Sequence, residues 1–276
     1  MTTTSRGLDP AATTALDQLV AARATGQPCP PVRDLLPAAD VDAAYAIQSA
    51  WLAGQLAAGA RVVGRKIGLT NPAVQAQLGV DQPDSGVLLD TMACPAGQPI
   101  DRARTLQPKI EAEIAFVLAA DLDRPDIGLA EVAAATDYVV AALEIVDSRI
   151  AGWDIKIVDT VADNASSGLF VLGDRRQRLD RLDLADCVME MRRGGTVVSA
   201  GTGADCLGHP LAAVAWLAAA VRDRGNPLRA GEVILSGALG PMVAVGPGDA
   251  FVADISGLGQ VSTAFTDGTV FTDGTA

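Results

Sequence analysis

The amino-acid sequence predicts an α+β fold, in which a β-rich core follows a small helical region at the N-terminus. Within the first 60 residues, apolar side chains recur at helical spacing. Beyond residue 60, short apolar runs separated by glycine-containing turns outnumber the helical segments. Strands and helices do not alternate regularly there, so a parallel sheet of βαβ units is not expected. The core is therefore predicted to be a mixed or antiparallel sheet.

Two helices are expected in the N-terminal region. Apolar residues at helical spacing predict a first helix that ends at Gly26. A second helix is predicted from about Asp40, whose carboxylate would cap it, to Ala58. Residues 1–60 are accordingly assigned to a helical N-terminal region.

Residues 61–265 are expected to form one β-rich domain. The block 81–86 is dominated by turn-forming residues and predicts a turn. The repeat Phe-Thr-Asp-Gly-Thr near the C-terminus predicts a flexible tail over 266–276. Helices are predicted over 71–79, 129–136 and 210–224. Strands are predicted over 61–69, 109–118, 138–146, 169–172, 232–235, 250–255 and 260–265, with a hairpin over 187–199.

Composition excludes several classes of protein. Hydrophobic residues make up 49% of the 276 residues, which is enough for a buried core and argues against disorder. The net charge of -12 argues against a nucleic-acid partner, because phosphate binding needs excess lysine and arginine. The sequence shows neither a secretory signal nor an uninterrupted apolar run of about 18 residues, so no membrane partner is expected. Four widely spaced cysteines predict reduced thiols in the cytoplasm: Cys29, Cys94, Cys187 and Cys206.

A pair of glutamates in one predicted strand is the main functional signal. Side chains two residues apart in a strand point to the same face, so Glu111 and Glu113 are expected to lie side by side. Two carboxylates this close repel each other unless a positive group lies between them. The apolar residues at the alternate positions of this strand would point to the opposite face, into a core: Ile110, Ala112, Ile114 and Phe116.

A third glutamate, Glu144, lies in the apolar strand predicted over 138–146, where an unpaired buried carboxylate is costly. One divalent cation bound by Glu111, Glu113 and Glu144 would explain all three. An all-oxygen site favours Mg²⁺ or Mn²⁺ over zinc and leaves about three of six octahedral positions open. The alternative is a solvated edge, with Glu111 and Glu113 paired to Lys109 or to arginines.

Two further charged residues have both a functional and a structural interpretation. Lys66, flanked by Gly64 and Gly68, would direct an ammonium group into a pocket or lie at the surface. Asp84 would act as a general base on a loop or bond to backbone amides in a turn. His209, the single histidine, is expected to cap or pack against the following helix rather than to act in catalysis.

Two polar segments are similarly open to both interpretations. Residues 153–168 would wrap around a polar substrate or cap and turn the chain. Residues 235–240 would offer backbone N–H groups and a hydroxyl to a carboxylate, or form a plain turn.

Seven blocks of sequence carry a resemblance to a known family. In their order along the chain they resemble the fumarylacetoacetate hydrolase superfamily, and within it the 2-hydroxypenta-2,4-dienoate (2-keto-4-pentenoate) hydratases of meta-cleavage aromatic catabolism. The resemblance extends from about Pro31 to Phe265. The blocks are VVGRKIGLT (62–70), QLGVDQPDSG (77–86), LQPKIEAEIAFVL (106–118), ALEIVDSRI (142–150), VDTVADNASSG (158–168), CLGHPL (206–211) and ILSGALGPMVAV (234–245).

The resemblance implies a fold and a set of site residues. The fold would be the mixed roll or sandwich of the fumarylacetoacetate hydrolase C-terminal type, with residues 61–265 as the catalytic domain. Lys66 and Asp84 would be catalytic. The metal ligands would be Glu111, Glu113 and Glu144, and the substrate pocket would include Asn164, Ser166, Ser236 and Gly237.

The same resemblance implies partners. A small-molecule 2-hydroxydienoate or 2-oxo acid would be the substrate. The chain would form homo-oligomers, often pentamers or decamers in this family, and could associate with another enzyme of its pathway. In the related hydratases an aromatic residue often follows the aspartate of the DQPD block. Here that residue is Ser85, so the pocket would be wider or more polar if this position touches the substrate tail.

The activity implied is the metal-dependent addition of water to a 2-hydroxy-2,4-dienoate, giving a 4-hydroxy-2-oxoalkanoate. Three alternatives remain at the level of sequence. They are a 4-oxalocrotonate-type decarboxylase, a fumarylpyruvate-type C–C hydrolase and a non-catalytic subunit that stabilises a partner enzyme.

Overall fold

The computed structural model describes residues 8–37, 40–71, 75 and 82–266. Helix α1 (Pro10–Thr25) is capped by Asp9 and ends at Gly26, whose φ of 68° is left-handed. Helix α2 (Val41–Ala57) is capped by Asp40, which accepts from the Ala43 amide at 2.9 Å. Both N-terminal helices are therefore confirmed. Most of the helix predicted over 71–79 and all but Thr266 of the predicted tail lie outside the described residues.

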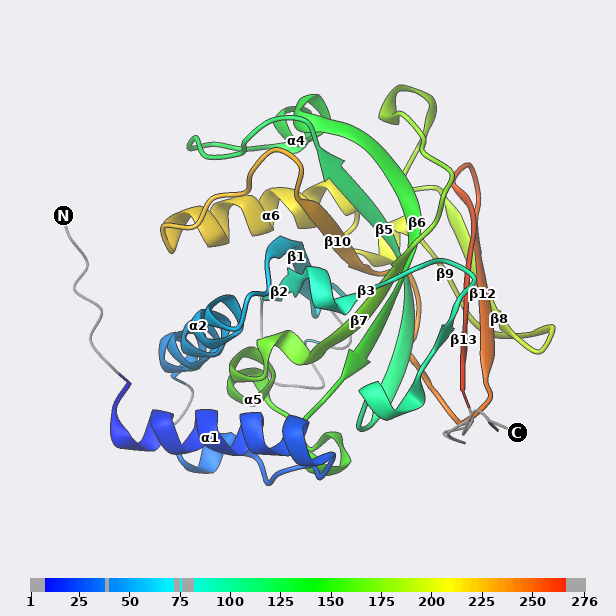
Figure 1. Cartoon of the computed structure of the whole chain (residues 1–276). Coiled ribbons are helices and arrows are strands. Elements are labelled where there is room, and N and C mark those ends of the chain that lie inside the picture. The colour runs from blue at the N-terminus through cyan, green and yellow to red at the C-terminus, as the bar shows by residue number, and fades with distance from the viewer. Residues whose placement is uncertain (1–7, 38–39, 72–74, 76–81, 267–276) are drawn as a thin grey trace.

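Two sheets form the rest of the chain (Figure 1). The larger is mixed, because β1 pairs with β10 in parallel whereas β5 is antiparallel to both of its long neighbours. Its order is β2 (Asp84–Leu89), β1 (Val62–Gly68), β10 (Val233–Ala238), β5 (Pro108–Leu118), β6 (Thr136–Asp147), β7 (Ser167–Leu172) and β3 (Ala93–Cys94), with β11 (Val243–Ala244) beside β5. The smaller sheet has the order β4 (Pro99–Ile100), β13 (Gly259–Phe265), β12 (Ala250–Ile255), β8 (Val188–Arg193) and β9 (Thr196–Thr202).

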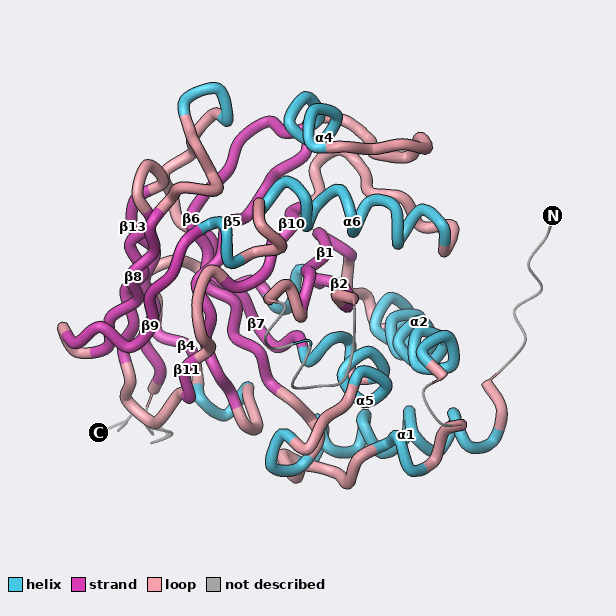
Figure 2. Tube along the Cα trace, turned by 180° about the vertical axis from the view of Figure 1, so that it is seen from behind, coloured by secondary structure: helices cyan, strands magenta, loops and turns pink. Residues whose placement is uncertain are grey.

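The main core lies against the face of β5 that alternation predicts. Ile110, Ala112, Ile114 and Phe116 are all buried there, with apolar residues of β12 and β13. Helices α4 (Leu129–Ala135) and α6 (Pro210–Asp223) cover another part of this core (Figure 2). His209 caps α6 by accepting from the Leu211 amide at 3.0 Å, as the sequence predicts.

The apolar composition of α6 reflects this core position. Within the described part of the chain, the stretch Gly203–Asp223 is long and apolar enough to cross a membrane by length and composition alone. The same test is passed by core helices of soluble proteins. Here Ala213, Val214 and Leu217 are fully buried against the main core, so packing against the sheet accounts for the apolar face.

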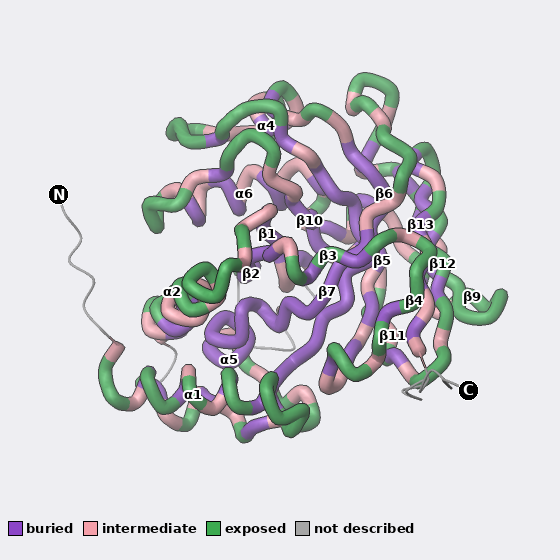
Figure 3. The backbone as a smooth tube through the Cα atoms, in the orientation of Figure 1, coloured by how far each residue is buried: buried purple, intermediate pink, exposed green. Residues whose placement is uncertain are grey.

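The helices α1, α2 and α5 (Ile157–Ala162) form a second layer, at the end of the molecule away from the smaller sheet (Figure 1). They share a separate apolar cluster that includes Ile47 and Val161. Figure 3 shows that α5, β6 and β7 are buried along most of their lengths. Polar side chains on these elements consequently face other protein groups or an internal cavity.

The prediction of a turn over 81–86 is wrong, because strand β2 begins at Asp84. Aspartate, serine and glycine disfavour strands, so local preference alone indicates a turn. The structure overrides it by pairing Ser85 with Ile67 of β1. Residues of α2 reinforce that pairing, because Gln48 donates to the Ser85 carbonyl at 2.9 Å and the Ser85 amide donates to Tyr45 Oη at 3.2 Å.

Candidate active site

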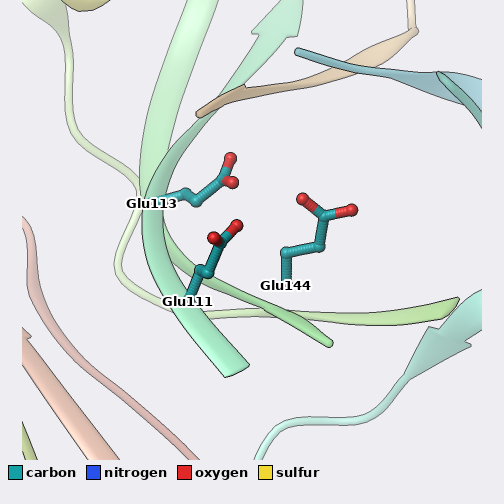
Figure 4. A group of neighbouring side chains, drawn as sticks. All are labelled: Glu111, Glu113 and Glu144. Atoms are coloured by element: carbon teal, nitrogen blue, oxygen red, sulfur yellow. The ribbon is translucent and has the colours of Figure 1, made fainter. Parts of the chain in front are cut away.

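Three glutamates meet where β5 and β6 pair at the centre of the larger sheet. The register places Glu111 directly opposite Glu144, and Glu113 lies two residues along β5 on the same face. One carboxylate oxygen from each lies within 4.8 Å of the others, and Figure 4 shows the three groups pointing toward a common space. Glu113 is 0% exposed and Glu144 is 1% exposed. Because β5 lies between β10 and β6, the alternative of a solvated edge is wrong.

The partners of these carboxylates leave room for a cation. Glu113 Oε2 accepts from the Gly237 amide at 2.8 Å, and Glu144 Oε1 lies 3.3 Å from Lys66 Nζ. Glu113 Oε1 and Glu144 Oε2 are buried and accept no hydrogen bond from any described residue. One lysine does not balance three glutamates, and buried oxygens without donors are costly. The residues present therefore fit a hard divalent cation such as Mg²⁺ or Mn²⁺.

Burial and neighbouring carboxylates also raise the pKa values of the three glutamates. Burial, followed by the charge of Glu144, raises the pKa of Glu111 to about 7. Burial and the charges of Glu144 and Glu111 raise the pKa of Glu113 well above its usual value. Burial also raises the pKa of Glu144, although the charge of Lys66 opposes the shift. A cation placed among them would favour the ionised forms.

These shifts predict that magnesium affinity rises with pH. A cation binds the ionised carboxylate, so protons on Glu111 compete with it below about pH 7. We expect calorimetric titrations at about pH 6 and about pH 8 to show weaker binding at the lower pH, with protons released on binding. An affinity that is constant across this interval would contradict the protonation of Glu111.

The stability of the metal-free protein should depend on pH in the opposite sense. Because the folded-state pKa of Glu111 lies above its usual value of 4.5, the folded state binds the proton more tightly than the unfolded state. Stability is therefore expected to fall as the pH rises from about 4.5 through about 7. Thermal unfolding with and without magnesium tests this, since added metal should remove the decline.

Lys66 on β1 and Asp84 on the adjacent strand β2 lie on the same side of the larger sheet as the glutamates. They are 3% and 1% exposed. Gly68 permits their approach, because a Cβ there would lie 2.2 Å from Asp84 Oδ1 and 3.4 Å from Lys66 Nζ. Burial alone would lower the pKa of Lys66, but the surrounding carboxylates, Glu144 foremost, raise it above its usual value. Lys66 is therefore an ammonium ion at neutral pH.

Asp84 is set apart from the glutamates by its hydrogen bonds. Thr160 Oγ1 on α5 donates to Asp84 Oδ2 at 3.2 Å. Burial raises the pKa of Asp84, while Lys66 and then Thr160 act in the opposite direction. A buried carboxyl group with a raised pKa beside a fixed ammonium ion is suited to exchanging protons with a bound molecule.

A cavity of about 190 Å³ opens onto these groups. Its polar wall is formed by Lys66, Asp84, Glu111, Thr160 and Ser166. Its remaining walls are mainly apolar, with Lys109 as a second cation. The apolar residues are Leu69, Val146, Trp153, Ile155, Ala165 and Met242. Such a cavity suits a small molecule with one anionic end and a short hydrocarbon body.

The predicted pocket residues are placed differently from one another. Ser166 lines the cavity, in a run of three left-handed residues, and its hydroxyl lies 3.3 Å from that of Thr160. Asn164 is engaged with β2 instead, accepting from the Val87 amide at 2.8 Å and donating to its carbonyl at 2.9 Å. Ser236 and Gly237 lie behind Glu113, outside the lining of this cavity, where Gly237 bonds the glutamate.

Ser85 does not line the cavity either. Its side chain lies on the opposite face of β2 from Asp84, with its hydroxyl 3.3 Å from that of Tyr45. This position therefore does not face the cavity, because adjacent strand residues point to opposite faces. An aromatic residue here would face α2 rather than the reacting groups.

Sequence reasoning did not assign Lys109 or Met242 to the pocket, whereas Trp153 and Thr160 belong to the segment 153–168 that it left open between wrapping a substrate and turning the chain. For Lys109 a signal was present, since it precedes Glu111 and Glu113 by two and four residues in the same strand. Its ammonium group lies 4.2 Å from the centre of the Trp153 ring. Thr160 and Met242 carry no such local pattern and reach the cavity only through tertiary packing.

Comparison with known proteins assigns this chain and its fold to a family. The family model described as fumarylacetoacetate (FAA) hydrolase C-terminal matches residues 61–266, which is most of the chain. The chain belongs to the fumarylacetoacetate hydrolase family. The three glutamates, Lys66 and Asp84 all lie within the segment that this family model matches.

Individual members of the family resemble the chain over nearly its whole length. It is 54% identical to "2-keto-4-pentenoate hydratase 2" of Dechloromonas aromatica, over 95% of this chain and 99% of that protein. It is 55% identical to "2-keto-4-pentenoate hydratase 1" of the same organism, over 90% of this chain and 94% of that protein. The solved structure of 4-oxalocrotonate decarboxylase from Pseudomonas putida G7, complexed with magnesium and adipate, has a TM-score of 0.87 and 36% identity, covering 95% of this chain and all of that one.

Proposed function

We propose that the chain is a divalent-metal-dependent hydratase that adds water to a 2-hydroxy-2,4-dienoate of the 2-hydroxypentadienoate type. The observation that carries the proposal is the glutamate cluster beside Lys66, whose half-buried member Glu111 lines a largely apolar cavity together with Lys66 and Asp84. Identity above half to two 2-keto-4-pentenoate hydratases, over 90% or more of the chain, supports this reaction over others of the family.

The reaction consists of a proton shift followed by addition of water. Moving the 2-hydroxyl proton to C5 converts the dienol into a 2-oxo-3-ene. Water then adds at C4 and a proton at C3, giving a 4-hydroxy-2-oxoalkanoate, so that atoms balance with one water consumed. When bound by Glu111, Glu113 and Glu144, Mg²⁺ or Mn²⁺ would supply Lewis-acid stabilisation of negative charge on the 2-oxygen.

The remaining roles fall to the protein. Lys66 stays charged and, beside the glutamates, would attract the substrate carboxylate and stabilise charge as it develops. Asp84, with its raised pKa, would take and return the proton that moves between oxygen and carbon. Trp153 and Ile155 would exclude bulk water from the hydrocarbon part of the substrate.

Asp84 should depend on Thr160 for its position. We expect Thr160→Val, which removes the 3.2 Å hydrogen bond but keeps the side-chain shape, to lower kcat by about tenfold with little change in KM. Steady-state kinetics test this, with Ser199→Ala as the control for loss of a buried hydroxyl outside the cavity. A rise in KM with unchanged kcat would instead assign Thr160 to substrate binding.

The decarboxylase is the second candidate, because a solved 4-oxalocrotonate decarboxylase superposes with a TM-score of 0.87. Its substrate carries a second carboxylate, and Lys109 places one cation in the otherwise apolar wall of the cavity. Assays of a 2-hydroxydienoate and of 4-oxalocrotonate, with and without magnesium, separate the two reactions. Loss of dienoate absorbance without CO₂ release supports the hydratase, and CO₂ release from 4-oxalocrotonate alone would replace it with the decarboxylase.

The proposed enzyme would act as a homo-oligomer, as the family resemblance implies. Light scattering coupled to gel filtration gives the mass of the assembly directly. A monomer that turns over the dienoate at full rate would reject this part of the proposal.

A further inference from the structure

A second polar cavity lies on the face of the larger sheet opposite to the glutamates. In β1, Lys66 points toward the glutamates, so the neighbouring Arg65 points the other way. The cavity there has a volume of about 80 Å³. It lies among α2, the β1–β2 pair and the C-terminal end of α6; Figure 1 shows the strand pair between these helices. Its polar lining comprises Gln48, Ser49, Arg65, Ser85, Arg224 and Asn226.

Arg65 is a buried cation without a carboxylate partner among the described residues. It is 6% exposed, and its one hydrogen bond, to the Gly64 carbonyl, is long at 3.4 Å. Arg149 is similarly buried, yet it forms an ion pair with Asp163 and also donates to three backbone carbonyl groups. Glu232 acts on Arg65 electrostatically but forms no ion pair with it. A guanidinium left unpaired in a buried site is costly, so this arrangement calls for an anion.

A second guanidinium faces the same cavity. Arg224 stacks on the Tyr45 ring, 3.8 Å from its centre, and donates to the Ala220 carbonyl at 3.1 Å. These contacts fix the group at the cavity while leaving it without a carboxylate partner among the described residues. No aspartate or glutamate belongs to the described lining, so both guanidinium groups face the cavity without an acidic residue in its walls.

We propose that this cavity is a binding site for a small oxyanion, with Arg65 as its buried ligand and Arg224 as its outer one. A guanidinium offers paired N–H donors that match two oxygens of a phosphate or a carboxylate. The hydroxyl of Ser85, which lies 3.3 Å from that of Tyr45, adds a neutral polar group to this wall, whereas Ser49 Oγ donates to the Tyr45 carbonyl at 2.8 Å. Such an anion would connect α2, β1 and the end of α6, and its binding would be independent of the reaction at the glutamates.

Inorganic phosphate is the probe that tests the site. The full-length protein, with saturating magnesium, is unfolded thermally over a phosphate series at constant ionic strength. We expect the Tm of the wild type to rise by roughly 3 °C at saturating phosphate, because a ligand that binds only the folded state stabilises it. The same unfolding series with acetate in place of phosphate tests whether a carboxylate also binds the site.

Variants identify the residue responsible. Arg65→Met should abolish the phosphate-dependent rise, and without phosphate it should unfold at or above the wild-type Tm because an uncompensated charge has gone. Arg65→Lys keeps the charge but not the paired donors, so about tenfold more phosphate should be needed. Arg61→Gln, at an exposed arginine that pairs with Asp90 just before the same strand, should respond as the wild type does.

Three results would overturn the proposal. One is the absence of any phosphate response in the wild type. Another is an undiminished response in Arg65→Met, which would place the phosphate elsewhere, for example at the glutamates. The third is a smaller assembly for Arg65→Met than for the wild type in sedimentation, which would assign Arg65 to an acidic group of a second copy.

Discussion

Glu113→Gln is expected to lower magnesium affinity and kcat/KM by about 100-fold or more, because it removes one of the three carboxylates of the proposed cation site. The substitution is nearly isosteric, and the new amide oxygen can still accept from the Gly237 amide, which now bonds Glu113 Oε2 at 2.8 Å. The local fold should therefore persist. Isothermal titration with magnesium and assays at saturating metal measure the two losses separately.

The same substitution should stabilise the metal-free protein. Glu113 is fully buried, and burial and its carboxylate neighbours raise its pKa, which shows that the ionised form is unfavourable there. Removing that charge relieves repulsion with Glu111 and Glu144. Loss of activity with a higher Tm in the absence of metal thus distinguishes a ligand from a residue needed for folding.

Glu190→Gln provides the matched control. Glu190 also lies in a strand, β8, but it is only partly buried and pairs with Arg192. We expect this variant to bind magnesium and to turn over substrate as the wild type does. Full activity of Glu113→Gln with added Mg²⁺ or Mn²⁺ would reject the metal assignment.

Local signals in the sequence were sufficient for much of the fold. Asp40 and Gly26 mark a helix start and a helix end because capping depends on neighbouring backbone groups. The inward face of β5 was predictable because alternation in a half-polar strand has only one arrangement that buries Ile110 and Ile114. These features are decided within a few residues of chain.

The register of β5 against β6 was not predictable in this way. The apolar run over 139–146 is buried on both faces of β6, so it lacks the alternation that would fix which residue faces which. Only the folded sheet shows that Glu144 lies opposite Glu111. The cost of an isolated glutamate in an apolar strand indicated that Glu144 needs a partner, but not the identity of that partner.

The prediction of a turn where strand β2 begins was wrong for a related reason. Asp84 and Ser85 are turn formers by local preference, and the groups that hold them in a strand come from distant segments. Tyr45 and Gln48 contact Ser85 from α2, and Thr160 contacts Asp84 from α5. The two faces of this short strand consequently serve different cavities, which local sequence could not reveal.

Lys66→Met is expected to reduce kcat by a factor on the order of 10²–10⁴, with a smaller effect on magnesium affinity than Glu113→Gln. Lys66 Nζ lies 3.3 Å from Glu144 Oε1 and lines the cavity, so its charge would act on the substrate as well as on the proposed metal ligands. Single-turnover rates at saturating metal and substrate measure the chemical step. Lys109→Met, which removes a half-buried cation from the same cavity beside Trp153, should have a much smaller effect on kcat.

Lys66→Met is also expected to lower the stability of the metal-free protein, which is measured independently of kcat. Without metal, the variant leaves Glu144 buried and unpaired, a loss worth about 3–5 kcal/mol for buried ion pairs. Because the carboxylates raise the folded-state pKa of Lys66 above its usual 10.5, its contribution is present below about pH 10.5 and is lost only above that value. The Tm deficit should therefore appear at neutral pH, and magnesium should reduce it by supplying positive charge to Glu144. A deficit that magnesium leaves unchanged, together with wild-type kcat, would make Lys66 a residue of the fold and remove it from the reaction.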